Sequence, residues 1–377
     1  MATFATKDGT KKYAARFATR AAAGHFREQQ GLWLSSLGIG TYLGEADERT
    51  DAGYTGAVVA AVEAGANVID SAINYRFQRS ERSIGAALTE LGRRGFSREE
   101  LLVCTKGGFL TPDGDMPADA SEYFNREYVE TGILREGDVA AGCHSMAPRF
   151  LADQLDRSRR NLGVETVDVY YLHNPETQLG EVPREMFHSR VRAAFEFLES
   201  AVAAAKIHFY GMATWNAFRQ PEDAPDYLSL ATMESLARDI AGGSHHFRFV
   251  QLPCNLGMTE ALTRPNQLFD PPAGGSEAGR KVPTVEAANR LGITLMASAS
   301  MLQGQLSRGL PAFVKAALGM NTDAERALQF VRSTPGITTA LVGMSRREHV
   351  AANLALAGVE PASQDQFTRL FERGKRV

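Results

Sequence analysis

The sequence has little cysteine. Its three cysteines, Cys104, Cys143 and Cys254, lie far apart along 377 residues and form no Cys-x-x-Cys pair. An odd, scattered set of this kind supports neither a disulfide framework nor a zinc site built on paired cysteines. We therefore expect reduced thiols, no metal centre and a cytoplasmic location.

Long apolar runs and an excess of one charge are also missing. No stretch approaches the roughly 20 apolar residues that cross a bilayer, and the first thirty residues lack the apolar segment of a signal peptide. Lys and Arg number 41 against 44 Asp and Glu, a net charge of −3, with no long run of either sign. These absences argue against a secreted or membrane protein and against a nucleic-acid partner. With 44% hydrophobic residues, the chain can bury a large core.

Short apolar, β-branched runs recur eight times, and stretches with helical spacing separate them. Eight strands that alternate with helices are too many for one half of a doubly wound sheet and match a single closed barrel. We expect an α/β fold, a (β/α)8 TIM barrel in one domain. The predicted strands are Leu34–Ile39, Asn67–Ile69, Leu101–Thr105, Val167–Leu172, Ile207–Met212, Phe247–Leu252, Ile293–Ala297 and Thr338–Val342.

Segments outside this alternation complete the predicted organisation. Residues 1–30 are expected to form an N-terminal extension with a β-hairpin that turns at Asp8-Gly9, followed by the barrel over 31–360 and a tail over 361–377. The long stretch Gly107–Pro148, rich in Gly, Pro and Asp, separates the third and fourth strands. Because a loop of that length is usually functional or mobile, we expect it over an active site at the C-terminal face of the barrel.

A glycine-rich segment after the first strand invites a different fold. Gly38-Ile39-Gly40, with Asp70 at the end of the next strand, is similar to a Rossmann dinucleotide fingerprint. That fingerprint needs its third glycine at the start of a helix, where the pyrophosphate binds. Leu43 stands at this position instead, so we interpret the segment as a strand end at a barrel rim.

Four polar residues stand at or just beyond the ends of consecutive predicted strands. Asp70 ends the second, Lys106 the third and His173 the fourth, and Tyr75 follows Asp70 by five residues. Each alone has an ordinary explanation as a helix cap, a core residue, a solvated residue or a structural histidine. Because the strand ends of a parallel barrel converge on one mouth, where barrel enzymes place catalysis, we expect the four to meet.

These side chains suit proton donation to a carbonyl. Free tyrosine titrates at about 10, a neighbouring ammonium lowers that pKa, and an aspartate holds the ammonium. A neutral imidazole can orient the carbonyl oxygen. None of the four supplies a hydride, so a nicotinamide cofactor is implied. A Schiff-base role for Lys106 would indicate an aldolase-like barrel instead, but the Asp70–Tyr75 pairing favours a reductase.

Six motifs appear in order along nearly the whole chain: IDSAINYRFQRSERSIGAAL, CTKGG, DVYYLHNPE, KIHFYGMATWN, VQLPCNL and GMSRREHVAAN. Together they resemble the aldo-keto reductase family. The resemblance implies that the four residues form a catalytic tetrad with Tyr75 as the general acid, and that the cofactor is NADP(H).

The resemblance also implies a set of cofactor-binding positions. Thr214 keeps a hydroxyl where the family binds the nicotinamide carboxamide, Ala213 cannot bond there, and Asn216 is an alternative partner. Ser298 stands where the family commonly stacks a tyrosine on the nicotinamide, so either another group packs that ring or hydride transfer is weakened. The expected set is Gly40, Thr41, Tyr42, Thr214, Asn216, Gln251, Ser298, Gly304, Gly343, Ser345, Arg346, His349 and Asn353.

Arg346 decides the expected choice of cofactor. A guanidinium can bind a 2′-phosphate bidentately, which favours NADPH over NADH. The alternative is a solvated residue in the first turn of a helix, where a cation is unfavourable unless it faces an anion.

We therefore expect an NADPH-dependent oxidoreductase that interconverts an alcohol and a carbonyl, in an aldehyde, a ketone or a sugar. Two alternatives stay open. One is a lyase or epimerase that oxidises a sugar transiently, and the other is a cofactor-binding regulatory subunit, because potassium-channel β-subunits resemble the same family. The small-molecule substrate would be selected by Tyr42, Phe77, Trp215 and the Gly107–Pro148 loop. No feature of the sequence indicates the oligomeric state.

Overall fold

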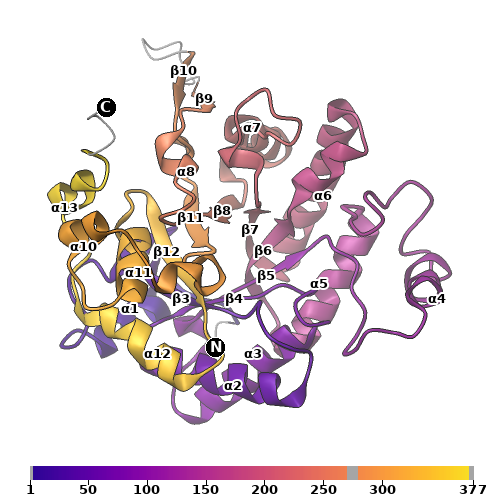
Figure 1. Cartoon of the computed structure of the whole chain (residues 1–377). Helices are drawn as coiled ribbons and strands as arrows, with labels where there is room; N and C mark the ends of the chain where they lie inside the picture. Colours follow the sequence, from indigo (N-terminus) through magenta and orange to yellow (C-terminus); the bar gives the residue numbers. More distant parts are fainter. Residues whose placement is uncertain (1–2, 270–278, 373–377) are drawn as a thin grey trace.

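Eight parallel strands close into a barrel in the computed structural model, which describes residues 3–269 and 279–372 (Figure 1). Around the barrel, hydrogen bonds join the strands in the order β11-β12-β3-β4-β5-β6-β7-β8. The TIM-barrel prediction is confirmed. The barrel strands are β3 (Leu37–Gly40), β4 (Val68–Asp70), β5 (Leu102–Gly107), β6 (Val167–His173), β7 (Ile207–Ala213), β8 (Phe247–Pro253), β11 (Thr294–Ser298) and β12 (Ile337–Gly343).

Side chains fill the interior of the barrel. Because alternate residues of a strand face the same side, Leu102, Cys104 and Lys106 of β5 share one face. Leu102 and Cys104 pack in a buried cluster with Val169 and Tyr171 of β6. Lys106 therefore lies in the layer above this cluster, at the end of the strand where the barrel opens.

Helices cover the outer face of the barrel (Figure 1). Polar caps fix several of their starts: the Asp47 side chain accepts from Thr50 N ahead of α2, and Thr322 forms a capping box with Glu325 ahead of α11. The helices are α2 (Glu48–Glu63), α3 (Arg79–Arg93), α5 (Pro148–Leu162), α6 (Arg184–Ala203), α7 (Leu230–Ala241), α8 (Glu260–Thr263), α9 (Thr284–Arg290), α10 (Ala312–Leu318), α11 (Asp323–Ser333) and α12 (Arg347–Leu354).

The N-terminal extension closes the far end of the barrel, and the predicted hairpin turn at Asp8-Gly9 is wrong. These two residues lie in a helix, α1 (Lys7–Arg16), which starts because the Thr6 hydroxyl caps Gly9 N at 3.0 Å. A hairpin does form, but later, between β1 (Phe26–Gln29) and β2 (Leu32–Ser35). Its turn is Gln30-Gly31, and both residues have positive φ, as a tight hairpin turn requires.

The predicted first strand, Leu34–Ile39, is shared between two sheets. Its first residues belong to β2 of the hairpin, and only Leu37–Gly40 enters the barrel. Leu32 and Leu34 of β2 pack in the same buried cluster as Leu102 of β5. The apolar run is thus longer than one strand because its first residues pack against the base of the barrel and its last residues form a barrel strand.

The long loop between β5 and α5 carries structure of its own. It contains a short helix, α4 (Ala120–Phe124), and one π-helical turn, Asn125–Val129. A small cluster of Tyr128, Leu134 and Phe150 attaches this part of the loop to the start of α5. In Figure 1 the α4 segment projects from the side of the barrel beyond α5.

The remaining elements come from the C-terminal part of the sequence. β9 (Gln267–Phe269) pairs with β10 (Arg280–Val282), and the described part of the tail forms α13 (Gln364–Arg369). Phe367 of α13 stacks on Phe330 of α11 at 5.4 Å, so the tail packs on the barrel. The last five residues of the predicted tail lie outside the described residues. No helix in the described ranges is long and apolar enough to cross a membrane.

Candidate active site

The four predicted tetrad residues meet at the open end of β4, β5 and β6. Lys106 Nζ lies 2.7 Å from Asp70 Oδ2 and donates to the Ser71 carbonyl oxygen at 2.6 Å. The same Nζ is 5.1 Å from the centre of the Tyr75 ring. The Tyr75 and His173 rings are 5.8 Å apart, edge to face. Strand order produces this grouping, because β4, β5 and β6 are neighbours in the barrel.

Burial governs how the tetrad titrates. It lowers the pKa of Lys106, but the charge of Asp70, its hydrogen bond to the ammonium and other nearby groups together more than offset this, so the pKa ends above its usual value and the amine stays an ammonium. Burial raises the pKa of Tyr75, and the Lys106 ammonium opposes this without reversing it. The expected net lowering of the Tyr75 pKa is therefore not found. At neutral pH Tyr75 is a phenol that still holds its proton.

His173 is neutral at this site. Burial and the nearby Lys106 ammonium lower its pKa well below the usual range. Its Nδ1 is buried and has no hydrogen-bond partner among the described residues. The neutral ring therefore best carries its proton on Nε2, the nitrogen that can donate to a substrate oxygen.

The second oxygen of the Asp70 carboxylate also accepts a hydrogen bond. Gln251 of β8 donates from Nε2 to Asp70 Oδ1 at 2.8 Å. Gln251 was expected near the nicotinamide, and the structure shows that it also contacts the tetrad. The sequence gives no signal for this contact, because β8 lies on the opposite side of the barrel order from β4.

A cavity of about 610 Å³ opens beside the tetrad and extends toward the start of α12. Asp70, Tyr75 and His173 line it, and Lys106 lies buried beneath them. Twelve of the expected cofactor positions also line it: Gly40, Thr41, Tyr42, Thr214, Gln251, Ser298, Gly304, Gly343, Ser345, Arg346, His349 and Asn353. A volume of this size suits a small-molecule ligand.

Asn216 is the expected position that does not reach the cavity. Its Nδ2 donates to Asp226 Oδ2 at 2.9 Å, so the side chain is engaged behind the wall. Tyr54 of α2 lines the cavity although the sequence did not single it out. Its helical spacing places it on the buried face of α2, a pattern typical of core residues as well.

The far end of the cavity is basic. Arg346 is exposed, bonds His349 Nε2 at 2.8 Å, and has no carboxylate partner among the residues that the structure describes. Helix α2 packs closely against Ser345, the residue before Arg346, because Gly53 of α2 has no side chain. A Cβ at Gly53 would lie 2.8 Å from the Ser345 carbonyl oxygen. Arg346 is thus a cation available to a ligand at the far end of the cavity.

Two buried groups behind the mouth were not among the predicted site residues. Glu176 accepts at Oε1 from Trp215 N at 2.7 Å and Asn216 N at 3.1 Å, and burial raises the pKa of Glu176 to about 7. His144, from the long loop, bonds the His173 carbonyl oxygen through Nε2 at 2.8 Å, and burial lowers its pKa to about 4. Both fix the segments that carry mouth residues.

The chain is similar to known proteins over most of its length. The model of the Aldo/keto reductase family matches residues 36–234. A Schizosaccharomyces pombe protein named as a voltage-gated potassium channel subunit beta is 24% identical, over 87% of this chain and 86% of that protein. D-threo-aldose 1-dehydrogenase of a Pseudomonas species is 27% identical over 41% of each chain.

A solved structure gives the same picture of the fold. The aldo/keto reductase from Klebsiella pneumoniae in complex with NADP and acetate has a TM-score of 0.58 to this chain and 18% identity. The likeness covers 93% of this chain and 94% of that one. At this identity it shows a shared barrel architecture.

Proposed function

The chain belongs to the aldo/keto reductase family, and from that premise we propose that it is an NADP(H)-dependent oxidoreductase that interconverts a carbonyl and an alcohol, with Tyr75 as the general acid. The substrate would be a small aldehyde, ketone or sugar.

One observation carries this proposal: the Lys106–Asp70 ion pair is buried directly beside Tyr75 and His173 at the mouth of a cavity. The Lys106 side chain is 1% exposed and the Asp70 side chain 7% exposed. Removing two charges from water costs free energy that their attraction only partly offsets. Burial of such a pair in a cleft, with perturbed pKa values around it, is typical of a catalytic site.

The residues along the cavity fit NADP(H). The Thr214 hydroxyl is buried and has no hydrogen-bond partner among the described residues, which leaves it for an amide such as the nicotinamide carboxamide. At the other end, Arg346 offers a guanidinium to a phosphate. Ser345 and Asn353 line the same end. When bound, the reduced nicotinamide supplies the hydride that no side chain can supply.

The chain's own residues would handle the proton. Tyr75 Oη gives its proton to the carbonyl oxygen, which becomes the alcohol hydroxyl, and Tyr75 remains as a phenolate. The Lys106 ammonium stabilises that phenolate, and Asp70 holds the ammonium in place. His173 donates from Nε2 to the same carbonyl oxygen and so orients it. General acids of this kind contribute about 10²- to 10⁴-fold to the rate.

Aromatic and apolar side chains form the rim that a substrate meets. Tyr42, Leu43 and Trp215 line the cavity and are 56%, 41% and 44% exposed. Tyr42 lies 4.9 Å from Tyr75, ring centre to ring centre. Such a rim favours substrates with an apolar or aromatic face next to the carbonyl.

The test is NADPH oxidation with a reactive aromatic aldehyde, comparing the unmodified protein with Tyr75→Phe. We expect kcat to fall about 100-fold or more in the variant, because the proton donor is gone, while NADPH binding, followed by its fluorescence, is retained. Tyr13→Phe, in α1 at the far end of the barrel and outside the cavity lining, is the matched control and should keep full activity. Equal turnover by Tyr75→Phe would contradict the proposed general acid.

A second candidate function has one supporting observation, the 24% identity to the protein named as a potassium channel subunit beta. A cofactor-binding regulatory protein would retain NADPH and turn over none of a broad panel of carbonyls. The same assay therefore separates the two candidates.

A further inference from the structure

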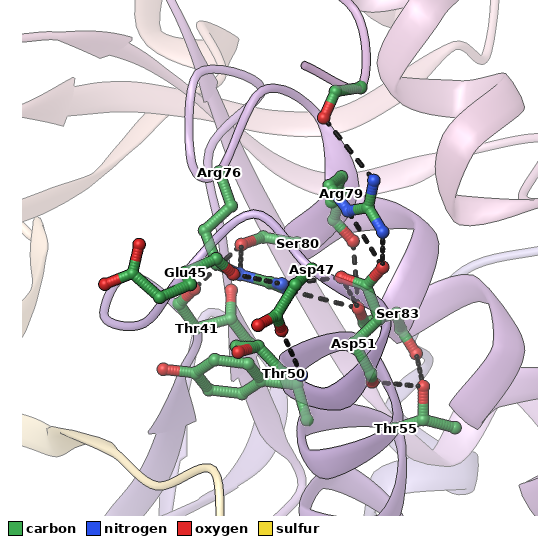
Figure 2. A network of polar contacts seen from close by, with 12 residues as sticks. Thr41, Glu45, Asp47, Thr50, Asp51, Thr55, Arg76, Arg79, Ser80 and Ser83 are labelled. Carbon is green, nitrogen blue, oxygen red and sulfur yellow. Dashed lines mark hydrogen bonds and ion pairs between the residues drawn. The ribbon is translucent and has the colours of Figure 1, made fainter. Parts of the chain in front are cut away.

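Arg76, the residue after Tyr75, has its guanidinium buried against three segments of the chain. Nε donates to Ser80 Oγ and Nη2 to Ser83 Oγ, both at 3.1 Å. Nη1 lies 2.6 Å from Asp51 Oδ1 and 3.4 Å from the Glu45 carbonyl oxygen. The side chain is 2% exposed. Figure 2 shows the guanidinium between α2, α3 and the segment that joins β3 to α2.

Asp51 is shared by two arginines. Arg79 of α3 donates from Nε to Asp51 Oδ2 at 2.9 Å, and its Nη2 lies 2.6 Å from the same oxygen (Figure 2). The carboxylate of α2 thus receives one arginine on each oxygen, which fixes its orientation. Charge-assisted hydrogen bonds on both oxygens fix the geometry of the carboxylate as well as its charge.

The backbone that follows Tyr75 is strained. Arg76, Phe77 and Gln78 all have positive φ, at 48°, 56° and 72°. Side chains with a Cβ rarely adopt this conformation, and it persists where surrounding contacts impose it. Here the contacts of Arg76 hold the start of the turn, and Gln78, which donates to the Pro112 carbonyl oxygen at 3.2 Å, holds its end.

The same network reaches the strand that carries Asp70. Ser80 Oγ, which accepts from Arg76, donates to the Thr41 carbonyl oxygen at 2.8 Å. Thr41 Oγ1 in turn donates to the Asp70 carbonyl oxygen at 3.2 Å. A continuous set of hydrogen bonds therefore joins Arg76 to the ends of β3 and β4.

Arg76 also supports one wall of the cavity. Its Cζ lies 4.9 Å from the centre of the Tyr54 ring, and Tyr54 Oη donates to the Leu43 carbonyl oxygen at 2.6 Å. Tyr54 and Leu43 both line the cavity between the tetrad and the end that carries Arg346. One guanidinium thus fixes both the Tyr75 turn and the Leu43–Glu45 segment.

We propose that Arg76 is a positioning residue that sets Tyr75 for proton transfer and, through Tyr54 and Glu45, holds the Leu43–Glu45 segment against bound cofactor. This inference rests on the proposed function and assigns it a residue outside the tetrad. Arg76 itself does not line the cavity.

The test is Arg76→Lys, which keeps the charge and loses the planar fork that bonds three segments. We expect kcat to fall about tenfold or more and NADPH to dissociate at least fivefold faster in stopped-flow fluorescence, with the KM for the aldehyde changed less than threefold. Arg76→Gly tolerates the positive φ but lacks the side chain, and low concentrations of methylguanidine should restore part of its kcat.

The matched control is Arg82→Lys. Arg82 lies on α3, the helix that follows the turn carrying Arg76, and pairs with Asp113 at the surface, outside the cavity lining. Equal NADPH release and equal kcat in Arg76→Lys and Arg82→Lys would overturn the inference, even if Arg76→Lys lowered the melting temperature. Failure of the proposed function looks different, because the unmodified protein would then fail to oxidise NADPH with the aldehyde, whether or not it binds NADPH.

Discussion

The two sides of the cavity differ in how completely their polar groups are bonded within the protein. On the tetrad side, Asp70 accepts from Lys106 on one oxygen and from Gln251 on the other. Among the groups expected to bind the cofactor, the Thr214 hydroxyl, next to Gln251, is buried without a partner among the described residues. On the side opposite the tetrad, Arg346 has no carboxylate partner among the residues that the structure describes.

This difference separates two physical tasks. Groups that transfer a proton must be oriented before the reaction, because reorganising them in the transition state would add to the barrier. Groups that bind a ligand can leave donors and acceptors to be completed by that ligand, because an unmade hydrogen bond at such a site becomes part of the binding free energy. We therefore expect substitutions on the two sides to change different measured quantities.

The largest expected effect is that of Lys106→Met, which disrupts the tetrad. It removes the ammonium that would stabilise a Tyr75 phenolate and leaves the Asp70 carboxylate with only its Gln251 hydrogen bond. We expect kcat to fall about 10³-fold, a loss of about 4 kcal/mol of transition-state stabilisation, and NADPH affinity to change little. Steady-state kinetics and NADPH titration check both numbers.

The control for that substitution is Lys206→Met. Lys206 pairs with Asp156 at the partly exposed surface, so its loss removes an ion pair without touching the cavity. An NADPH affinity that fell in parallel with kcat in Lys106→Met would contradict the separation of the two sides.

Glu176 holds the backbone of Trp215, a residue of the cavity rim, but its Oε2 is buried without a partner among the described residues. Its titration tests whether polar groups near the rim are bonded less completely than the Asp70 carboxylate. Burial raises the pKa of Glu176 to about 7, whereas in the unfolded chain it is about 4.3. Between these values the native state binds a proton that the unfolded state does not. The free energy of unfolding should therefore fall as pH rises from about 4 to about 7, by about 3 kcal/mol.

Glu176→Gln should remove this pH dependence. Urea unfolding at pH 5 and pH 8 measures it, with Glu181→Gln as the control, at an exposed position just beyond the short 3₁₀ helix Pro175–Gly180 that contains Glu176. The same loss of stability between the two pH values in Glu176→Gln and in the unmodified protein would show that Glu176 is not the titrating group.

Arg346→Gln should weaken cofactor binding on the side opposite the tetrad, with a smaller effect than Lys106→Met has on kcat. A charge-assisted hydrogen bond contributes about 1.5–3 kcal/mol, so the Kd for NADPH should rise about 10- to 100-fold. The Kd for NADH should be nearly unchanged, because it lacks the 2′-phosphate. Arg347→Gln, one residue along and outside the cavity lining, is the matched control. Equal weakening of NADPH and NADH binding would contradict phosphate recognition by Arg346.

The sequence was sufficient to predict the barrel and the grouping of the tetrad. Both follow from local patterns: eight apolar runs give eight strands, and strand ends of a parallel barrel meet at one mouth whatever the loops do. That is why Asp70, Lys106 and His173 could be placed together from their positions at strand ends alone.

Contacts set by the tertiary structure could not be predicted. Asp8-Gly9 has turn residues, yet the Thr6 cap makes a helix of that segment. Asn216 was expected at the cavity but bonds Asp226, ten residues along, behind its wall. The sequence did not single out Arg76, because its partner Asp51 is 25 residues away in the sequence. The net direction of the Tyr75 pKa depends on burial, which a sequence does not state.

The most direct test measures kcat at saturating NADPH and the Kd for NADPH side by side in Tyr75→Phe and Arg346→Gln. We expect the two substitutions to change different quantities. Tyr75→Phe should lose about 100-fold or more in kcat, with its Kd for NADPH changed less than threefold. Arg346→Gln should lose at least tenfold in NADPH affinity, with its kcat nearly retained. If both substitutions changed the same quantity, or if Tyr75→Phe kept its kcat, the division of the cavity into a proton-transfer side and a cofactor-binding side would be wrong.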